Sequence, residues 1–309
     1  MAMQSVTVRA PAKINLALAV GARGSDGYHP LTTVYQAVDL CDEIRATPTD
    51  VDDAITLTVT YDGRVATETA QIPLDEQNLA YRAAALLQER SGVGSGLTMA
   101  IRKAIPVSGG MAGGSADAAA ALVAADAVWG LGTPRGDLLA LAAELGSDVP
   151  FCLVGGTAMG TGRGDQVSPV LARGSYCWVL GLADRGLSTP EVYAEFDRLH
   201  EDAPPTQSQI APALLAALRA GDPAALGAVL SNDLTEATLS LRPELAETLA
   251  VGDECGALGG AISGSGPTAI FLAGDEEHAL DIALALTGAG VCADVVQATG
   301  PAPGARVIA

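Results

Sequence analysis

The chain has 309 residues, of which 49% are hydrophobic, so it is long enough for two domains with a substantial core. Its 36 acidic and 17 basic residues give a formal charge of −19, which argues against a general nucleic-acid-binding protein, because such proteins present a basic face. Any phosphate site must be local, made of backbone amides, a helix N-terminus or one or two cations, since the overall field repels anions.

Cysteine, histidine and hydropathy patterns argue against disulfide, zinc and membrane sites. The five cysteines are scattered, odd in number and never spaced as CxxC, which favours free thiols in a cytosolic protein over a disulfide framework. Of the three histidines, none is paired at metal-ligand spacing. The apolar stretch around Asn15 is short and lacks a cleavage site, so it predicts a strand rather than a signal peptide. No run approaches the ~20 apolar residues of a membrane span, so we expect a cytoplasmic protein that makes no membrane contact.

The first half of the chain is rich in predicted strands. Alternating apolar residues predict two strands within 5–20, separated by Pro11, and further strands over 31–48, 54–63 and 96–106. Helical patterns cover 78–92, 115–129 and 135–145. The strands are grouped early rather than alternating regularly with helices, which favours an α+β fold.

The second half begins after a seam at 161–175, which is rich in glycine and polar residues and lacks helical periodicity. We therefore predict two domains, 1–160 and 161–309. The elements expected after the seam are a strand over 176–184, a helix over 189–199, a surface loop over 200–209, helices throughout 210–252, a glycine bend entering a strand over 259–274, a helix over 278–290 and a strand over 291–300. The tail 300–309 is expected to be a surface segment.

The stretch "IPVSGGMAGGSADAAAALVAAD" (105–126) runs from a short strand through a glycine bend into a long helix. Its four glycines are followed by Ser115, a natural N-cap. Glycines let backbone N–H groups approach an anion, and the helix adds the positive end of its dipole, so the arrangement suits phosphate. The stretch matches neither the Walker pattern nor GxGxxG. A tight bend for close helix packing is the alternative.

Lysine is scarce, because Lys13 and Lys103 are the only lysines among the 17 basic residues. Lys13 lies between apolar neighbours and is either a compact point charge for a phosphate or an edge-strand lysine that prevents aggregation. Lys103, next to Arg102, is expected to be a rim charge near the glycine loop. Asp148 follows a helix, as cap and turn residues do, but beside a cation and a hydroxyl-bearing substrate it would suit a phosphotransferase.

A second polar turn, "GSDGYHPLTTVYQ" (24–36), contains Tyr28 and His29 between glycine and proline. An aromatic ring and an imidazole in a turn can stack on and hydrogen-bond a ring-shaped ligand, or can pack as an ordinary turn. A further glycine bend, "AISGSGPTAI" (261–270), gives only a weak phosphate signal.

Together these segments resemble the GHMP kinase superfamily. The resemblance covers almost the whole chain and rests, in order, on "APAKINLAL", "DGYHPLTTVYQAVDLCD", "IPVSGGMAGGSADAAAAL", "LGSDVPFCLVGGTAMGTGRGD" and "AISGSGPTAIF". It implies a two-domain α+β fold with an N-terminal ATP-binding domain, a C-terminal α/β sandwich and the active site in the cleft between them. "PAKINL" with "DGYH" downstream indicates the branch that phosphorylates a cytidylyl substrate in the non-mevalonate isoprenoid pathway.

The resemblance also implies residue roles. Asp148 would take the proton from the acceptor hydroxyl, and Lys13 would orient Asp148 and offset the charge of the transferring phosphoryl group. ATP, with a magnesium ion whose ligands stay unassigned, would be bound by Pro106, Val107, Ser108, Gly109, Gly110, Met111, Ala112, Gly113, Gly114, Ser115 and Ala116. The cytidylyl substrate would be bound by Asn15, Tyr28, His29, Gly264, Ser265 and Gly266. No protein partner is implied.

The chain departs from the family pattern at the glycine loop. The family commonly has glycine at 108 and 112, a second serine at 116 and asparagine at 117, where this chain has Ser108, Ala112, Ala116 and Asp117. A carboxylate facing the nucleotide would repel phosphate, so we expect Asp117 to point away from the phosphates or to help hold the metal.

Two other functions stay open. Homoserine and mevalonate kinases share the superfamily, but their substrates carry no base to stack on the "DGYH" turn. A non-catalytic nucleotide-binding homologue would have no reason to keep both Lys13 and Asp148. Tyr193 and Phe196 are candidates for a second ring that stacks on the base, although core packing would explain either.

Overall fold

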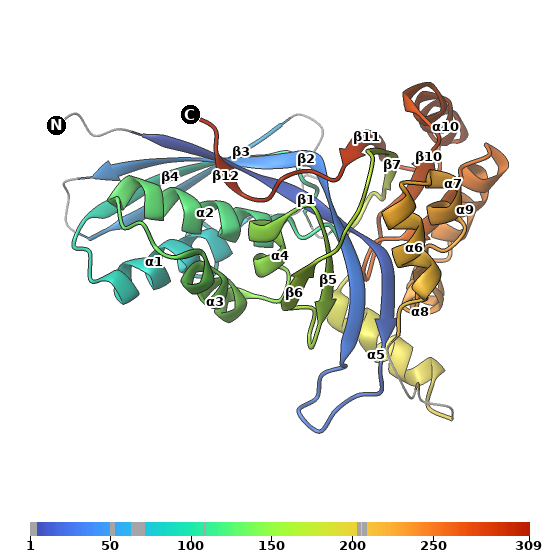
Figure 1. Ribbon diagram of the computed structural model, residues 1–309, viewed down its shortest axis with the longest axis horizontal. Coiled ribbons are helices and arrows are strands. Elements are labelled where there is room, and N and C mark those ends of the chain that lie inside the picture. Colours follow the sequence, from blue (N-terminus) through green and yellow to red (C-terminus); the bar gives the residue numbers. More distant parts are fainter. Residues whose placement is uncertain (1–4, 50–52, 63–71, 108, 203–204, 206–208) are drawn as a thin grey trace.

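Two β-sheets and the helices that cover them make up the fold of the computed structural model, which describes residues 5–49, 53–62, 72–107, 109–202, 205 and 209–309 (Figure 1). The first sheet has the order β12-β1-β2-β4-β3; β5 is added on β2, β6 on β5 and β8 on β1. Its strands are β1 (Val6–Val20), β2 (Leu31–Thr49), β3 (Ile55–Tyr61), β4 (Gly96–Lys103), β5 (Thr157–Thr161), β6 (Gln166–Pro169), β8 (Ser231–Asn232) and β12 (Arg306–Val307).

Helices α1 (Leu79–Ser91), α2 (Gly113–Trp129), α3 (Arg135–Leu145) and α4 (Val149–Val154) lie on one side of this sheet (Figure 1). Helix α1 starts where the Asn78 side chain accepts the Ala80 N–H, and it ends at Gly92 in the left-handed conformation. Helix α2 packs on β1 and β2 through a run of fully buried alanines, whose small side chains let helix and sheet approach closely.

Strand β1 is continuous, so the predicted break at Pro11 is wrong. Pro11 faces Cys41 on β2, whereas the next residue, Ala12, faces Val38. Strand β2 therefore has two extra residues at this point, and the irregularity lets the sheet tolerate a residue that has no N–H to donate. Strand β1 stays paired with β2 from Val6 to Val20, and Lys13 lies within this paired stretch.

The second sheet is fully antiparallel, with the order β11-β7-β10-β9. Its strands are β7 (Tyr176–Leu182), β9 (Gly259–Ile262), β10 (Ala269–Ala273) and β11 (Asp294–Gly300). The helices of this half are α5 (Thr189–Leu199), α6 (Pro212–Ala220), α7 (Pro223–Gly227), α8 (Thr235–Leu241), α9 (Leu245–Glu254) and α10 (Glu276–Ala289). The expected run of helices over 210–252 is interrupted by β8, which pairs in parallel with β1 at Ala17 and Leu18.

The two halves share buried contacts. Trp178 on β7 donates its indole N–H to Gln36 Oε1 on β2 at 2.8 Å, and the Gln36 amide nitrogen donates to Thr157 Oγ1 at 3.0 Å. The end of β1 packs through Leu18 against Phe196 of α5, within a small separate core. These contacts satisfy buried polar groups and remove apolar surface from water at the junction, so they fix the two sheets relative to each other.

The seam and the tail differ from expectation. Strands β5 and β6 form a hairpin that includes the first residues of the 161–175 seam, and this hairpin belongs to the first sheet. The domain boundary at residue 160 stays a prediction. The tail is not a mere surface segment, because Ala302 and Gly304 are buried and β12 pairs with β1.

All five cysteines are free thiols. No helix in the described residues has the length and apolar character needed to cross a membrane.

The glycine bend after β4 meets the second half of the chain at Gly110. This residue has φ of +76°, and a Cβ there would lie 2.5 Å from the Ser263 carbonyl oxygen and 2.7 Å from that of Gly266. A side chain is excluded on both counts, because the backbone conformation and the space each require glycine. We call residues 109–114 the glycine segment and residues 263–266 the C-terminal bend.

We predict that Gly110→Ala lowers the free energy of unfolding by about 2 kcal/mol more than Gly130→Ala does, because only the first methyl group strikes neighbouring backbone. Gly130 has a similar φ of +65° but open space around it, so it controls for left-handed strain. Denaturant unfolding measures both. Equal losses would show that the glycine segment does not touch the C-terminal bend.

Candidate active site

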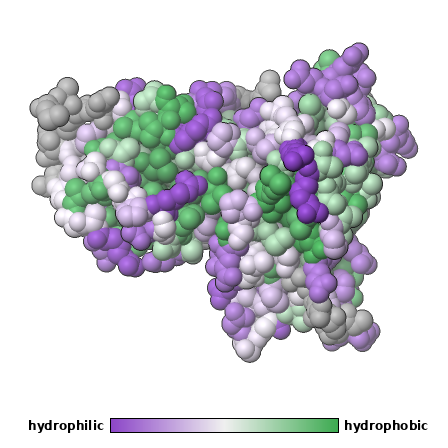
Figure 2. All heavy atoms as spheres, viewed as in Figure 1, coloured by the Kyte–Doolittle hydropathy of each residue, from purple (hydrophilic) through white to green (hydrophobic). Residues whose placement is uncertain are grey.

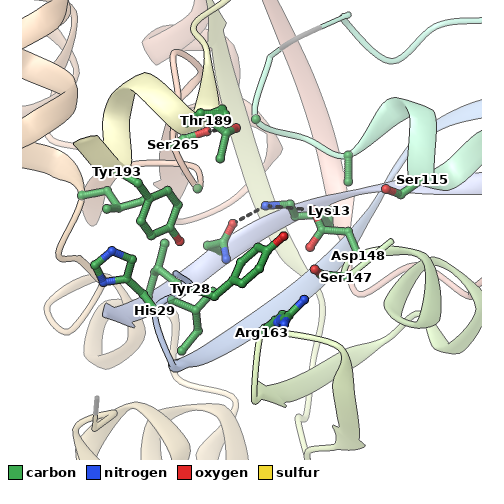
Figure 3. A pocket seen from close by; sticks show the side chains of 18 of the residues that line it. Lys13, Tyr28, His29, Ser115, Ser147, Asp148, Arg163, Thr189, Tyr193 and Ser265 are labelled. Atoms are coloured by element: carbon green, nitrogen blue, oxygen red, sulfur yellow. Dashed lines mark hydrogen bonds and ion pairs between the residues drawn. The ribbon is translucent and has the colours of Figure 1, made fainter. Parts of the chain in front are cut away.

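A cleft of about 690 Å³ lies where the glycine segment, β1, α5 and the C-terminal bend converge. The outline of the molecule is indented between α1–α3 and the part that contains α5 (Figure 2). The predicted site residues that line the cleft are Lys13, Asn15, Tyr28, His29, Pro106, Gly109, Gly110, Ala112, Gly113, Gly114, Ser115, Asp148, Gly264 and Ser265. Figure 3 shows His29 and Tyr193 at one side of this cleft and Ser115 at the other, with Lys13 and Asp148 between them.

Four of the predicted site residues that the structure describes do not line the cleft. Met111, within the glycine segment, and Ala116, in the first turn of α2, are fully buried in the core. Val107 and Gly266 are outside the lining, although the Gly266 carbonyl contacts the position of Gly110. Ser108 lies outside the described residues.

Lys13 is held by a directed chain of hydrogen bonds. Its ammonium donates to Asn15 Oδ1 at 2.6 Å, and the Asn15 amide nitrogen donates to Thr33 Oγ1 at 2.8 Å. Thr33 in turn donates its proton to the Ala17 carbonyl oxygen at 2.7 Å. Because the threonine proton is committed to Ala17, its oxygen accepts from the amide, and the amide oxygen is turned toward Lys13. Asn15 thus positions the lysine as well as lining the cleft.

The environment of Lys13 excludes the edge-strand alternative. Its side chain is only 7% exposed, and its backbone N–H donates to the Met111 carbonyl oxygen at 3.2 Å. Gly264 approaches from the second half, where a Cβ would lie 3.0 Å from the ammonium. Lys13 therefore stands at the point where β1, the glycine segment and the C-terminal bend meet.

Asp148 faces Lys13 rather than capping the helix that follows it. It is the N-cap residue of α4, but its side chain makes no capping hydrogen bond. Instead Asp148 Oδ2 lies 4.0 Å from Lys13 Nζ, and 30% of its side chain is exposed to the cleft region. A carboxylate that is neither a cap nor fully solvated, beside a buried ammonium, is available to accept a proton from a bound ligand.

Tyr35 lies behind this pair and was not predicted. Its buried ring lies 5.6 Å from Lys13 Nζ and packs on Phe151. Burial raises the pKa of Tyr35 well above its usual range, and the negative charge of Asp148 raises it further. The phenol therefore stays neutral. Tyr35 lies directly opposite Asn15 on β1, and because the pairing shifts between Asn15 and Ala17, the sequence alone does not give this register.

The N-terminus of α2 opens into the cleft. The helix begins at Gly113, so Ser115 is inside its first turn and the predicted N-cap role is wrong. The N-cap residue is Ala112, which makes no side-chain cap and sits in the left-handed region at φ of +59°. An alanine there costs about 1–2 kcal/mol, which glycine would avoid. The first-turn amides consequently have no side-chain acceptor at the cap and remain available for an anion.

Asp117 and Lys103 lie behind the cleft. Lys103 is 1% exposed, so the expectation of a rim charge is wrong. Asp117 is 3% exposed and accepts from Lys103 at 2.6 Å, turned away from the glycine segment's cleft face. Asp117 therefore points away from the phosphate side of the glycine segment, as one of the two expectations had it. It does not reach the cleft, where a metal would be held.

The aromatic side of the cleft is built on a turn and on α5. Tyr28 is 54% exposed, and the Arg163 guanidinium lies 3.7 Å from its ring centroid. Arg163 also pairs with Asp26 at 3.2 Å. Tyr193 of α5 lines the same cleft, whereas Phe196 is buried in the core. Of the two candidates for a second ring that stacks on the base, only Tyr193 is therefore in position.

His29 is anchored through both ring nitrogens. Nδ1 lies 2.8 Å from the Gly21 carbonyl oxygen, and Nε2 lies 3.2 Å from Asp197 Oδ1. Both partners are acceptors, so both hydrogen bonds are complete only when the ring carries two protons. Its ring centroid is 5.2 Å from that of Tyr193. His29 therefore fixes the turn to α5 and leaves its ring surface beside Tyr193.

Several lining residues escaped prediction. Arg163 was assigned to the seam, although its place between glycines in "TGRGD" is typical of a hairpin turn that presents a side chain. Thr189 at the start of α5 exchanges a hydrogen bond with Ser265 at 2.8 Å, which ties α5 to the C-terminal bend. With Lys13 and Arg23, Arg163 supplies positive charge to the cleft of an otherwise acidic chain.

Comparisons with known proteins agree with the geometry. The family models of the GHMP kinases N terminal domain and GHMP kinases C terminal match residues 78–156 and 214–292. The chain is 55% identical over 304 residues to 4-diphosphocytidyl-2-C-methyl-D-erythritol kinase of Thermobifida fusca strain YX, which covers 98% of each chain.

Solved structures show the same fold. A crystal structure of 4-(cytidine 5'-diphospho)-2C-methyl-D-erythritol kinase is similar with a TM-score of 0.74 and 33% identity, covering 95% of this chain and 98% of that chain. A homoserine kinase from Cytophaga hutchinsonii has a TM-score of 0.75 at 21% identity, covering 100% of this chain and 98% of that chain. The second likeness shows the fold alone.

Proposed function

Because the chain belongs to the GHMP kinases, and among them to the family of 4-diphosphocytidyl-2-C-methyl-D-erythritol kinases, we propose that it phosphorylates that cytidylyl alcohol. The reaction transfers the γ-phosphate of ATP to the 2-hydroxyl of the methylerythritol part, in the methylerythritol phosphate pathway to isoprenoid precursors. The observation that carries the proposal is the pair of Lys13 and Asp148, 4.0 Å apart, between the glycine segment and the aromatic turn. A cytoplasmic location and the absence of nucleic-acid and membrane partners belong to the same proposal.

The substrate preference is tested directly by an ADP-release assay. We expect the wild-type chain to release ADP with the cytidylyl methylerythritol substrate and not with homoserine or mevalonate, because neither of these carries a base for the aromatic side of the cleft. Release with homoserine or mevalonate and none with the cytidylyl substrate would assign the chain to a different activity of the same fold.

ATP binds with its phosphates on the glycine segment. That segment and the first turn of α2 line the cleft, the start of the helix has no side-chain cap, and the helix dipole adds positive potential for an anion. A formal charge of −19 over the chain makes these local donors the main source of anion affinity. Ser115 adds the hydroxyl that lies in the cleft wall.

The cytidylyl group occupies the aromatic side. Tyr28 and Tyr193 both line it, and each offers a ring surface on which a pyrimidine can stack. Arg163 covers Tyr28 and holds the exposed ring in place, while the His29 contacts fix the turn to α5. Substrates without a base leave these surfaces unused.

In the chemical step Asp148 accepts the proton of the 2-hydroxyl while the hydroxyl oxygen bonds to the γ-phosphorus. The bond between the γ-phosphorus and the β–γ bridging oxygen breaks, and ADP leaves. Lys13 holds the carboxylate toward the cleft and offsets negative charge on the transferring group. Since phosphoryl transfer requires little covalent work from the protein, positioning and electrostatic stabilisation supply most of the rate. The directed chain from Lys13 through Asn15 and Thr33 keeps the ammonium in place during the step.

A magnesium ion fits this arrangement when it is held mainly by the ATP phosphates. In the described part of the chain no group of three or more His, Cys, Asp or Glu residues is gathered to hold a metal. Mg²⁺ keeps several waters and needs only one or two protein ligands, and the Ser115 hydroxyl in the cleft wall is placed to be one. Bound Mg²⁺ supplies neutralisation of the phosphate charge.

We predict that Asp148→Asn lowers kcat by about 100- to 10,000-fold, because the amide cannot accept the hydroxyl proton. ADP affinity should stay within about three-fold, since Asp148 caps no helix and supports no backbone of the glycine segment. Steady-state kinetics and calorimetric ADP titration measure the two effects. A variant that turns over at the wild-type rate would remove Asp148 from the proton transfer.

We predict that Tyr28→Ala raises the KM of the cytidylyl substrate by about 10-fold or more, the worth of one stacked ring, while the KM of ATP changes little. Tyr61→Ala serves as the control, because that ring is also exposed but lies outside the cleft lining. An equal rise in both KM values would place the turn away from the acceptor site.

A further inference from the structure

Three charged side chains form a buried cluster directly behind the glycine segment. Asp42 on β2, Lys103 at the end of β4 and Asp117 on α2 are 0%, 1% and 3% exposed. The Lys103 ammonium donates to Asp117 Oδ2 at 2.6 Å, to the Gly113 carbonyl oxygen at 3.2 Å and to Asp42 Oδ2. None of the three lines the cleft, so the proposed reaction has no direct use for them.

The cluster fixes the chain on both sides of the glycine segment. Where the chain leaves β4, Asp42 Oδ1 accepts the backbone N–H groups of Ala104 and Ile105 at 2.7 and 2.9 Å. Where the chain enters α2, Lys103 holds the Gly113 carbonyl and the Asp117 carboxylate. One ammonium therefore links the end of β4, the sheet and the first turn of α2.

Packing leaves little freedom in this arrangement. A Cβ at Gly113 would lie 3.3 Å from the Lys103 ammonium and 3.2 Å from Ile105 Cγ2, so glycine allows the ammonium to approach the helix. The buried Oδ1 of Asp117 has no hydrogen-bond partner among the residues that the structure describes. Groups buried at this density transmit a displacement of the ammonium to the backbone that it holds.

The charges of the cluster do not balance, because two carboxylates share one ammonium. Burial raises the pKa of Asp117 well above its usual range, and Lys103 offsets this only in part. Burial alone would lower the pKa of Lys103, but the two carboxylates outweigh it and raise it. With both acids ionised the cluster has a formal charge of −1, behind amides that are to bind phosphate.

We propose that Lys103 is a positioning residue for the nucleotide: clamped between Asp42 and Asp117, it holds the glycine segment and the first turn of α2 where their amides can meet the ATP phosphates. The proposal rests on the proposed function only in naming ATP as the ligand. It assigns the cluster to nucleotide affinity, whereas a merely stabilising cluster would change the resistance to unfolding and leave nucleotide affinity unchanged.

Two variants separate the clamp from the charge. Asp117→Asn removes one negative charge but keeps an oxygen that accepts from Lys103. The double variant Lys103→Met with Asp117→Asn leaves only Asp42 charged, so its formal charge of −1 equals that of the wild type while the clamp is gone. Arg102→Met is the matched control, because this neighbouring side chain on β4 is 59% exposed and points away from the cluster.

The readout is the Kd of ADP with magnesium chloride, measured by calorimetry on the full chain without acceptor. We expect Asp117→Asn and Arg102→Met to bind ADP at least as tightly as the wild type does. The double variant should bind it about 10-fold or more weakly, because misplaced donors lose affinity steeply with distance. The KM of the acceptor in the double variant should change by less than about two-fold.

An unchanged Kd in the double variant, or equal losses for ADP and acceptor, would overturn the proposal. Should the double variant not fold, Lys103→Arg replaces it, because a planar guanidinium cannot reproduce the three bonds of the ammonium. It should weaken ADP binding by at least about three-fold, and unchanged affinity would again overturn the clamp. A wild type that binds ADP but transfers no phosphate refutes the proposed function alone.

Discussion

The cleft depends on the attachment of the glycine segment to β1. The hydrogen bond from the Lys13 N–H to the Met111 carbonyl joins the segment to the strand whose side chain supplies the cleft's buried ammonium. Because one residue provides both the backbone attachment and the charge, the distance between the glycine segment and the Lys13 ammonium is limited by one hydrogen bond and the length of one side chain. The close approach of Gly110 and Gly264 then fixes the second half of the chain to the same point.

The few lysines of the chain lie in the interior of the protein. Both lysines of this acidic chain are buried, Lys13 in the cleft wall and Lys103 behind it. Burying a charge costs several kcal/mol, and a stable fold gains little from such pairs, so their presence on either side of the glycine segment indicates a functional constraint. Arginines at the cleft, such as Arg163, remain partly exposed, and their planar groups stack or pair rather than sit in the core.

The sequence predicted well what is encoded locally. The long helices with glycine ends have short-range signals, and the structure reproduces them. The neighbouring residues alone left Lys13 and Asp148 open between functional and structural roles, and only the resemblance to the kinase family assigned roles to them. Lys103 was misjudged although a signal existed: alternation along β4 places it on the same face as buried Ile101, opposite exposed Arg102. The pairing of β8 with β1 could not be predicted, because a two-residue strand carries no periodicity and its partner lies more than 200 residues away.

The C-terminal strand has a consequence for how the molecule is made. Strand β12 lies on β1, and the backbone of Thr7 exchanges hydrogen bonds with Ile308 and Ala309. This stretch of β1 thus keeps an open edge during synthesis until residues 306–309 have been added. Unpaired edges invite wrong partners, so this edge is exposed to mispairing during translation and is covered once the C-terminal strand has formed.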